Sequence, residues 1–412
     1  MDYYLNHKQK NPLILNQILQ TRFPTFDDSV IKWKYREKPI NSKFLEKKII
    51  DTFKNKKEDI LKKSNNYLEW INIFDKEINK LKSINKLPVL FFSGGKDSFF
   101  IASRLVENKI DALYFAFARN NIEKKLMTDL GNILNIKIFF TEKDLKYLDF
   151  DQILKKIKEP VLDPAGLSVL LLLDIAYKNK YKLSDLVFLD GMGNGPYMGI
   201  LPGKREISKM FYQKLFTKLL MHKILPYRLW NSIGRYGDLF RPSYAADIPG
   251  STIKLRNYYK DISFYERYNK LNDPVLERAL IRGLHYGFCS AMNKSSIYLD
   301  ACDKNSKMIF PFLNEDLFDF FEKQNSRQYD YPKLVDKISM RNYLNSKYSY
   351  NEIYDTKGIF HPTFLNFKFD NKQNDLAKKL NINTDQLNQF QKSDYYLWSK
   401  YIINNEIEVM NS

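Results

Sequence analysis

Cysteine is scarce in this chain of 412 residues, which contains only Cys289 and Cys302. Two cysteines can form neither a disulfide framework nor a four-thiolate zinc site, so we expect a reducing compartment, the cytoplasm. They do not form a CxxC pair, and we interpret them as structural thiols rather than sulfur-transfer groups. The histidines are also few, and their spacing is not that of metal ligands: His7, His222, His285 and His361.

Long apolar runs are missing as well. The strongest run, Leu167–Ile175, is short and contains Asp174. The first ten residues, MDYYLNHKQK, lack the apolar core of a signal peptide. We therefore expect no membrane partner. Hydrophobic residues nevertheless make up 44% of the chain and aromatic residues 15%, which excludes a disordered protein.

Acidic residues are fewer than basic ones. The chain has 66 Lys and Arg against 48 Asp and Glu, a formal net charge of +18. Such a charge is common in nucleic-acid-binding proteins. Here, however, the basic residues are 52 Lys and 14 Arg, whereas a specific basic stripe favours Arg. On charge we do not expect nucleic acid as a partner.

The length predicts two domains. Residues 1–86 are polar and basic, with helical spacing of apolar residues in Phe44–Phe53 and Leu68–Leu81, which indicates a helical N-terminal cap. The main domain is expected over 87–402, with an aromatic-rich insertion at about 201–293, a helical part after 310 and a tail over 403–412.

Strand and helix patterns alternate after residue 86. Apolar runs typical of buried parallel strands lie at Leu87–Phe92, Asp111–Phe117, Ile136–Phe140 and Leu186–Leu189. Helical spacing occurs at Phe99–Val106, Ile122–Leu134 and Leu167–Tyr177. This alternation predicts an α/β fold with a doubly wound parallel sheet. Ligands of such sheets bind at the carboxyl ends of strands, and glycine-rich loops follow Phe92 and Leu189.

The first of these loops has the sequence SGGKDS. Its glycines allow a tight turn that brings backbone N–H groups close to a phosphate, and its serines can donate hydrogen bonds. The positive end of the following helix favours an anion, and the lysine adds charge. Asp97 offers a carboxylate to Mg²⁺. The predicted phosphate-binding residues are Ser93, Gly94, Gly95, Lys96, Asp97 and Ser98.

This hexapeptide resembles the PP-loop of the N-type ATP pyrophosphatases. Other segments resemble, in order, motifs of the asparagine synthetase and β-lactam synthetase branch: Glu159-Pro160, Asp163-Pro164, the loop Asp190–Gly199, Phe310–Asn314, Lys337–Arg341 and Lys357–Phe360. The resemblance implies an adenine nucleotide alpha hydrolase-like fold that uses ATP and Mg²⁺. It implies an amide-forming ligase that adenylates a small-molecule carboxylate and passes it to ammonia or an amine, with release of pyrophosphate and AMP.

The resemblance also assigns roles to residues. Lys337 would be the catalytic lysine that stabilises negative charge at the α-phosphate, a large electrostatic contribution. Gly191 and Gly193 would bring the second loop close to the nucleotide, Lys357 would bind phosphate or AMP, and Leu113–Phe117 would place its backbone at the adenine. Asp97 and Asp190 would hold the metal.

Two departures accompany the resemblance. The second loop has Met192, Gly195 and Pro196 where the family has acidic residues, which leaves Asp190, Asn194 and Asp163 as the nearest polar candidates. The residue after the initiator Met is Asp2 rather than the nucleophilic cysteine of a glutaminase. We therefore expect no glutaminase domain in this chain. A separate glutaminase, a carrier protein, free ammonia or an intramolecular amine could supply the nucleophile.

Two other functions stay open at this point. A PP-loop enzyme that modifies tRNA would use the net positive charge, although the segments resembling asparagine synthetase disfavour it. A degenerate, non-catalytic nucleotide-binding member of the family would account for the missing acidic residues of the second loop.

Overall fold

The computed structural model describes residues 67–141, 150–157, 164–194, 198, 297–323, 329–330, 335–350, 368–379, 382–386, 389–404 and 406. The helical segment expected at Phe44–Phe53 and the expected insertion at 201–293 lie outside these residues. The strands are β1 (Leu87–Phe91), β2 (Leu113–Ala116), β3 (Ile138–Phe140), β4 (Leu186–Leu189), β5 (Lys307–Ile309), β6 (Tyr329–Asp330) and β7 (Val335–Asp336). The α-helices are α4 (Tyr67–Asn79), α5 (Lys96–Glu107), α6 (Asn121–Ile133), α7 (Phe150–Leu154), α8 (Ser168–Lys178), α16 (Ile297–Cys302), α17 (Glu315–Lys323), α18 (Ile338–Tyr348), α20 (Asn371–Lys379) and α21 (Gln389–Asn404).

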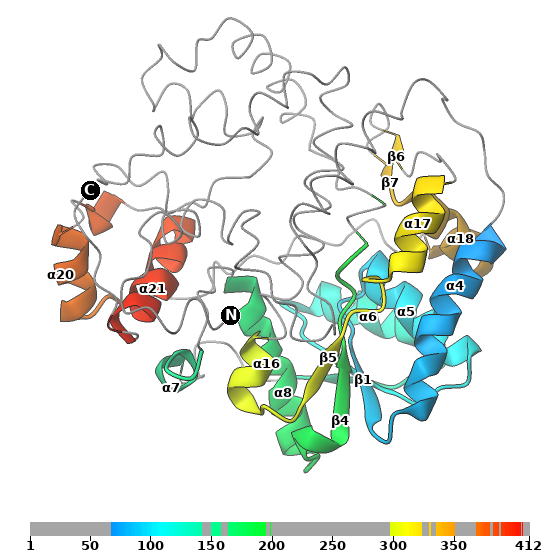
Figure 1. Ribbon diagram of the computed structural model, residues 1–412, viewed down its shortest axis with the longest axis horizontal. Helices are drawn as coiled ribbons and strands as arrows, with labels where there is room; N and C mark the ends of the chain where they lie inside the picture. Colours follow the sequence, from blue (N-terminus) through cyan, green and yellow to red (C-terminus); the bar gives the residue numbers. More distant parts are fainter. Residues whose placement is uncertain are drawn as a thin grey trace, which may run out of the picture.

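Five parallel strands form the central sheet, in the order β3-β2-β1-β4-β5 (Figure 1). The α/β class and the parallel sheet expected from sequence are confirmed, and the four predicted strands correspond to β1 to β4. The fifth strand, β5, was not predicted because its three residues begin with a lysine and give too short a signal. The strand order changes direction between β1 and β4, which is where ligands bind in open α/β sheets.

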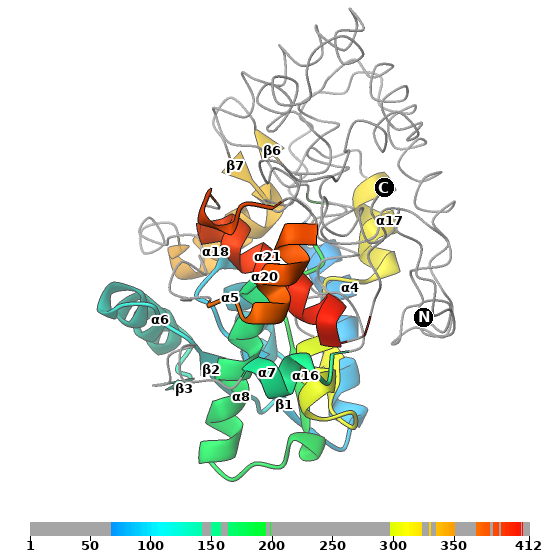
Figure 2. The ribbon, with the colours of Figure 1, turned by 90° about the vertical axis from the view of Figure 1, so that its left-hand side faces the viewer.

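Side chains of each strand point alternately to the two faces of the sheet. In β1 and the residue after it, Leu90 and Phe92 join one buried cluster with residues of α4, α5, α6, α17 and α18. Val89 and Phe91 join a second cluster on the opposite face with residues of α7, α8, α16 and α21. Helices therefore cover both faces, as Figures 1 and 2 show. This explains why the strands are almost continuously apolar.

Helix α4 belongs to the first of these cores. Trp70 and Phe74 are almost fully buried. Trp70 stacks on Phe100 of α5 at 4.8 Å between ring centroids, and Phe74 contacts Phe312 at 4.9 Å. The end of the segment expected to form an N-terminal cap thus shares its hydrophobic core with the sheet.

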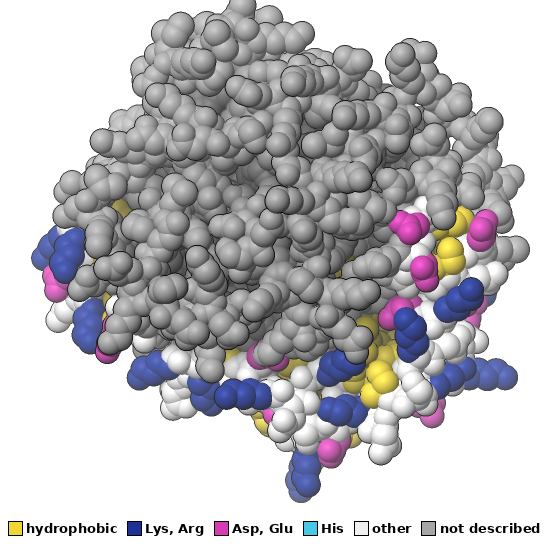
Figure 3. All heavy atoms as spheres, in the orientation of Figure 1, with side chains coloured by type: hydrophobic (Ala, Val, Ile, Leu, Met, Phe, Trp, Pro, Cys, Tyr) yellow, Lys and Arg dark blue, Asp and Glu magenta, His cyan; other side chains and the backbone are white. Residues whose placement is uncertain are grey.

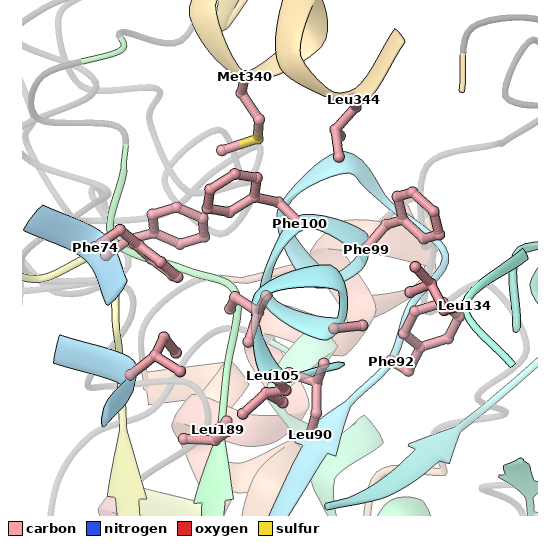
Figure 4. Close-up of a cluster of buried hydrophobic side chains, with 14 of the residues drawn as sticks. Phe74, Leu90, Phe92, Phe99, Phe100, Leu105, Leu134, Leu189, Met340 and Leu344 are labelled. Atoms are coloured by element: carbon pink, nitrogen blue, oxygen red, sulfur yellow. The ribbon is translucent and has the colours of Figure 1, made fainter. Parts of the chain in front are cut away.

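Helix α18 packs on the outer side of α5. In Figure 4, Met340 and Leu344 of α18 point toward Phe99 and Phe100 of α5, which lies between α18 and the sheet. Met340 and Leu344 are fully buried, and Tyr343 is nearly so. Their spacing of three and four residues gives α18 a short apolar stripe in the middle of an otherwise polar helix.

A partly buried ion cluster joins the far ends of these two helices to α4. Arg104 donates to both carboxylate oxygens of Asp75 at 2.8 and 2.6 Å, and to Glu107 at 2.7 Å. One oxygen of Glu107 accepts from the hydroxyls of Tyr343 and Tyr348, each at 2.6 Å. The other oxygen is 2.6 Å from Nζ of Lys347. The acceptor positions of the Glu107 carboxylate are therefore filled.

This cluster predicts a specific loss of stability in acid. Burial alone would raise the pKa of Glu107, but hydrogen bonds from Lys347, Tyr343 and Tyr348 and the charge of Arg104 outweigh it and lower the pKa to about 2. Since the pKa is lower in the folded state than the ordinary 4.5, the stabilisation is present above about pH 5 and is lost as the pH falls toward 2.

Glu107→Gln should consequently reduce the free energy of unfolding by roughly 2–3 kcal/mol at neutral pH, and by progressively less below about pH 5. Urea unfolding of both proteins at several pH values measures the difference. A difference that does not depend on pH would contradict the prediction.

Charged side chains on the visible surface are dispersed. On the face shown in Figure 3, Lys and Arg side chains of the described residues lie in separate places, with Asp and Glu among them. Among the described residues, no helix combines the length and the apolar character needed to cross a membrane.

Candidate functional site

The SGGKDS loop connects β1 to α5 as expected. Gly94 has a φ of +66°, a left-handed conformation that favours glycine. The hydroxyl of Ser98 accepts from the N–H of Ser93 at 3.2 Å and donates to the carbonyl of Gly95 at 3.1 Å. The N–H of Gly95 donates to the hydroxyl of Ser93 at 3.3 Å. The two serines therefore hold the turn in shape at the start of α5.

Asp97, in the first turn of α5, is the meeting point of three distant segments. Nζ of Lys337 lies 2.7 Å from Oδ1 and 2.6 Å from Oδ2 of Asp97. The side-chain amide of Asn194 donates to the same Oδ1 at 2.6 Å. Asn194 is buried and the Lys337 side chain is only 12% exposed, whereas the Asp97 side chain between them is 30% exposed. The site thus combines a carboxylate, a cation and an amide at one point.

The backbone of Lys337 is unusual. Its φ and ψ are 54° and 46°, a left-handed conformation immediately before α18. Other non-glycine residues with positive φ, such as Lys109, Asn135 and Lys180, lie just after helix ends, where this conformation is common. The left-handed conformation costs a residue other than glycine about 1–2 kcal/mol. Here the strained residue is the one whose side chain contacts Asp97.

The second glycine loop follows β4 and touches the first. A Cβ atom on Gly191 would lie 3.1 Å from Cβ of Asp97 and 3.2 Å from the backbone nitrogen of Ser98. Gly193 is buried, and Leu313 of the Phe310–Asn314 segment lies against it. A side chain at Gly191 would therefore force the two loops to move apart by a few tenths of an ångström.

Gly191→Ala should lower the free energy of unfolding by about 1–3 kcal/mol, because the new methyl group meets backbone and cannot be relieved by a rotamer change. Urea unfolding measures the loss. Gly131→Ala is the comparison variant: its methyl group meets the flexible end of Ile138 at 2.8 Å and the backbone carbonyl oxygen of Ile136 at 3.3 Å, but alanine is preferred to glycine in a helix, so its loss should be smaller. Equal stability of Gly191→Ala and the unmodified protein would contradict the expected crowding.

Asp190 and Asn194, both polar candidates from the sequence, have different contacts. Oδ1 of Asp190 accepts the N–H of Met192 at 3.0 Å, so this carboxylate shapes its own loop. Asn194 reaches across to Asp97. An amide rather than a second carboxylate therefore contacts the first loop.

The structure brings together most of the predicted site. The residues that lie in or beside the two loops are Ser93, Gly94, Gly95, Lys96, Asp97, Ser98, Asp190, Gly191, Gly193 and Lys337. Several other candidates lie outside the described residues: Lys357, Asp163, Cys289, His7, His222, His285 and His361. Cys302 is a free thiol on α16, and burial raises its pKa to about 11, which fits a structural role.

Comparison with known proteins adds no relative. Neither the protein-family models nor the curated proteins give a match to this chain. Its function is therefore inferred from the residues themselves and from their arrangement.

The donor set around Asp97 is compatible with Mg²⁺. Mg²⁺ is commonly held by one or two carboxylates together with substrate phosphates. Asp97 accepts three hydrogen bonds, two from Lys337 and one from Asn194, whereas a carboxylate offers about four acceptor positions. Among the described residues, no group of three or more His, Cys, Asp or Glu side chains is arranged to bind a metal. Asp97 could therefore contribute one position to a metal ion, and the other ligands would have to come from elsewhere.

One residue beside the site was missed in the sequence. The hydroxyl of Tyr350 donates to the carbonyl of Gly94 at 3.4 Å, and its ring stacks on Phe99 at 5.1 Å between centroids. Tyr350 is fully buried and ties the segment after α18 to the first loop. No local motif marks it, because its partners are about 250 residues away in sequence.

Proposed function

We propose that this protein is an ATP-dependent, AMP-forming carbon–nitrogen ligase with a PP-loop, adenine nucleotide alpha hydrolase-like fold. The observation that carries the proposal is the contact of Lys337 with Asp97 beside the two glycine loops. This contact lies at the carboxyl ends of β1 and β4, where the strand order changes direction. Transfer of the AMP group of ATP to a carboxylate requires three groups at one point: a turn that binds phosphate, a carboxylate that can hold Mg²⁺, and a cation.

In the proposed reaction, the SGGKDS loop and the N-terminal end of α5 bind the pyrophosphate part of ATP. A substrate carboxylate oxygen attacks the α-phosphorus, and the bond to the bridging oxygen breaks to release pyrophosphate. Lys337 stabilises the negative charge that grows at the α-phosphate. Mg²⁺, when bound, neutralises phosphate charge. Ammonia or an amine then attacks the acyl carbon, AMP leaves, and the amine loses a proton.

The test is to identify the products formed from ATP. Purified protein is incubated with ATP, Mg²⁺ and a panel of carboxylic acids and amines, and pyrophosphate, AMP and ADP are quantified. We expect pyrophosphate and AMP in equal amounts. Asp97→Asn should lose Mg²⁺-dependent turnover while it keeps its fold. Formation of ADP, or full turnover by Asp97→Asn, would contradict the proposal.

A non-catalytic nucleotide-binding protein is the second candidate. It is favoured by Asn194, an amide in the loop where the asparagine synthetase family carries acidic residues. ATP binding without release of pyrophosphate, over the whole panel, would favour this candidate.

An RNA-modifying PP-loop enzyme has less support. The segments Phe310–Asn314 and Lys337–Arg341, which resemble the asparagine synthetase branch, both reach the site through Leu313 and Lys337. RNA that copurifies with the protein and dissociates steeply with salt would revive this alternative.

A further inference from the structure

Helices α5 and α18 are joined by carboxylate–lysine pairs at both ends. At one end Asp97 pairs with Lys337 at 2.6 Å, and at the other Glu107 pairs with Lys347 at 2.6 Å. Asp97 and Glu107 are ten positions apart on α5, which corresponds to about 15 Å along a helix axis, and Lys337, just before α18, is also ten positions from Lys347. The two helices therefore lie side by side in the same direction and in a fixed register.

The apolar contact between the two helices is short. The buried residues of α18 are Met340, Tyr343 and Leu344, which span little more than one turn. At the far end, the ring of Tyr348 lies 5.6 Å from that of Phe99, and its hydroxyl donates to Glu107. Ring packing and the polar cluster around Glu107 therefore both hold this end of α18, and loss of the polar contacts should let it move more.

The Glu107 cluster has the features of such a restraint. Glu107 accepts from Tyr343, Lys347 and Tyr348, which all belong to α18. Arg104 is itself buried and is anchored to α4 through its paired hydrogen bonds to Asp75. The far end of α18 is thus connected through Glu107 and Arg104 to α4, which belongs to the hydrophobic core on one face of the sheet.

We propose that Glu107, held in place by Arg104, is a positioning residue: from the far ends of α5 and α18 it keeps Lys337 in contact with Asp97. The effect of Glu107 on turnover rests on the proposed function, because Lys337 stabilises a transition state only if the protein is such a ligase. The effect of Glu107 on the position of Lys337 is independent of that function and can be measured without any substrate.

The measurement is the reactivity of the Lys337 amine. Nζ of Lys337 donates to both oxygens of Asp97 and is mostly covered, so a trace of an acylating reagent should modify it slowly. Glu107→Gln should raise the rate of Lys337 modification by at least about threefold in the folded protein, because α18 opens more often. Peptide mass spectrometry gives the rate for each lysine.

Lys400 provides a matched control. Its side chain is also 12% exposed, and it pairs with Asp370 at 2.8 Å, between the start of α20 and α21. Asp370→Asn should raise the modification of Lys400 and leave Lys337 unchanged, and Glu107→Gln should do the reverse. A merely structural role for Glu107 would lower stability without this selectivity.

A second variant covers the case in which Glu107→Gln does not fold. Lys347→Met removes one partner of Glu107 from a half-exposed position and should raise Lys337 modification in the same direction, whereas Lys347→Arg should restore the slow rate. An unchanged Lys337 rate in the folded variants would overturn the proposal.

Kinetics separate the two proposals. If the protein turns over ATP, Glu107→Gln should lower kcat by at least about fivefold with KM for ATP nearly unchanged, because a displaced lysine costs mainly transition-state stabilisation. A normal kcat together with faster Lys337 modification would contradict the catalytic part. If the unmodified protein has no turnover, the proposed function fails, and the modification rates alone decide the positioning role.

Discussion

Lys337→Met should lower kcat for pyrophosphate release by about 100- to 1000-fold, the range seen when one fixed electrostatic group is removed from a developing negative charge. KM for ATP should change little, because in the proposed reaction the SGGKDS loop and the start of α5, rather than Lys337, bind the pyrophosphate part of ATP. Methionine approximates the aliphatic part of the lysine side chain and removes the cation. Steady-state kinetics with coupled detection of pyrophosphate give both constants.

Lys400→Met is the control for this loss. Lys400 has the same exposure as Lys337 and forms an ion pair of the same kind, but it lies on α21 rather than at the site. The control should keep kcat within about twofold. Normal turnover by Lys337→Met would remove Lys337 from the mechanism and leave Asp97 and the loops as a binding site only.

Phe100→Ala should lower the free energy of unfolding by about 3–5 kcal/mol, as expected when a buried phenylalanine is truncated and a cavity remains. Phe100 is fully buried and contacts four rings. Those of Trp70 and Phe74 on α4 lie at 4.8 and 4.9 Å, and those of Phe312 and Tyr343 at 5.9 and 5.6 Å. The substitution removes the centre of a cluster that joins α4, α5, α18 and the segment before α17. Urea or thermal unfolding measures the loss.

Phe139→Ala is the matched substitution at a less buried position. Phe139 lies on the edge strand β3, is only partly buried, and contacts the ring of Phe115 at 6.2 Å. Its loss should cost about half as much or less, because the site can relax toward solvent. Equal losses for Phe100→Ala and Phe139→Ala would contradict the central place of Phe100 in the core.

The predicted strands are examples of what local sequence could establish. The run LVFL at Leu186–Leu189 coincides with β4, because a strand covered on both faces needs apolar side chains at every position. Helix α5 begins at Lys96, three residues before the predicted Phe99, because its first turn carries the polar residues of the loop rather than core residues. Strand β5 escaped prediction because it is short and is stabilised mainly by pairing with β4.

The candidate site was predictable in part. The prediction that Ser93–Ser98 binds phosphate rests on glycines, serines and an aspartate between a strand and a helix. The role of Lys337 came from a resemblance, and no periodicity in the sequence connects it with Asp97. Asn194 and Asp190 were both candidates, and only their positions in the folded loop distinguish the residue that contacts Asp97 from the one that shapes its own turn.

The alternating apolar runs already establish an α/β chain, and the SGGKDS turn already predicts a phosphate-binding loop, since each depends on residues close together in sequence. The meeting of Asp97, Asn194 and Lys337 depends on packing, because these residues are separated by 97 and 240 positions. The same is true of the Glu107 cluster. Hydrophobic burial brings α4, α5 and α18 together without regard to sequence distance, and polar groups enclosed in that process must find partners there, because an unpaired buried charge costs several kcal/mol.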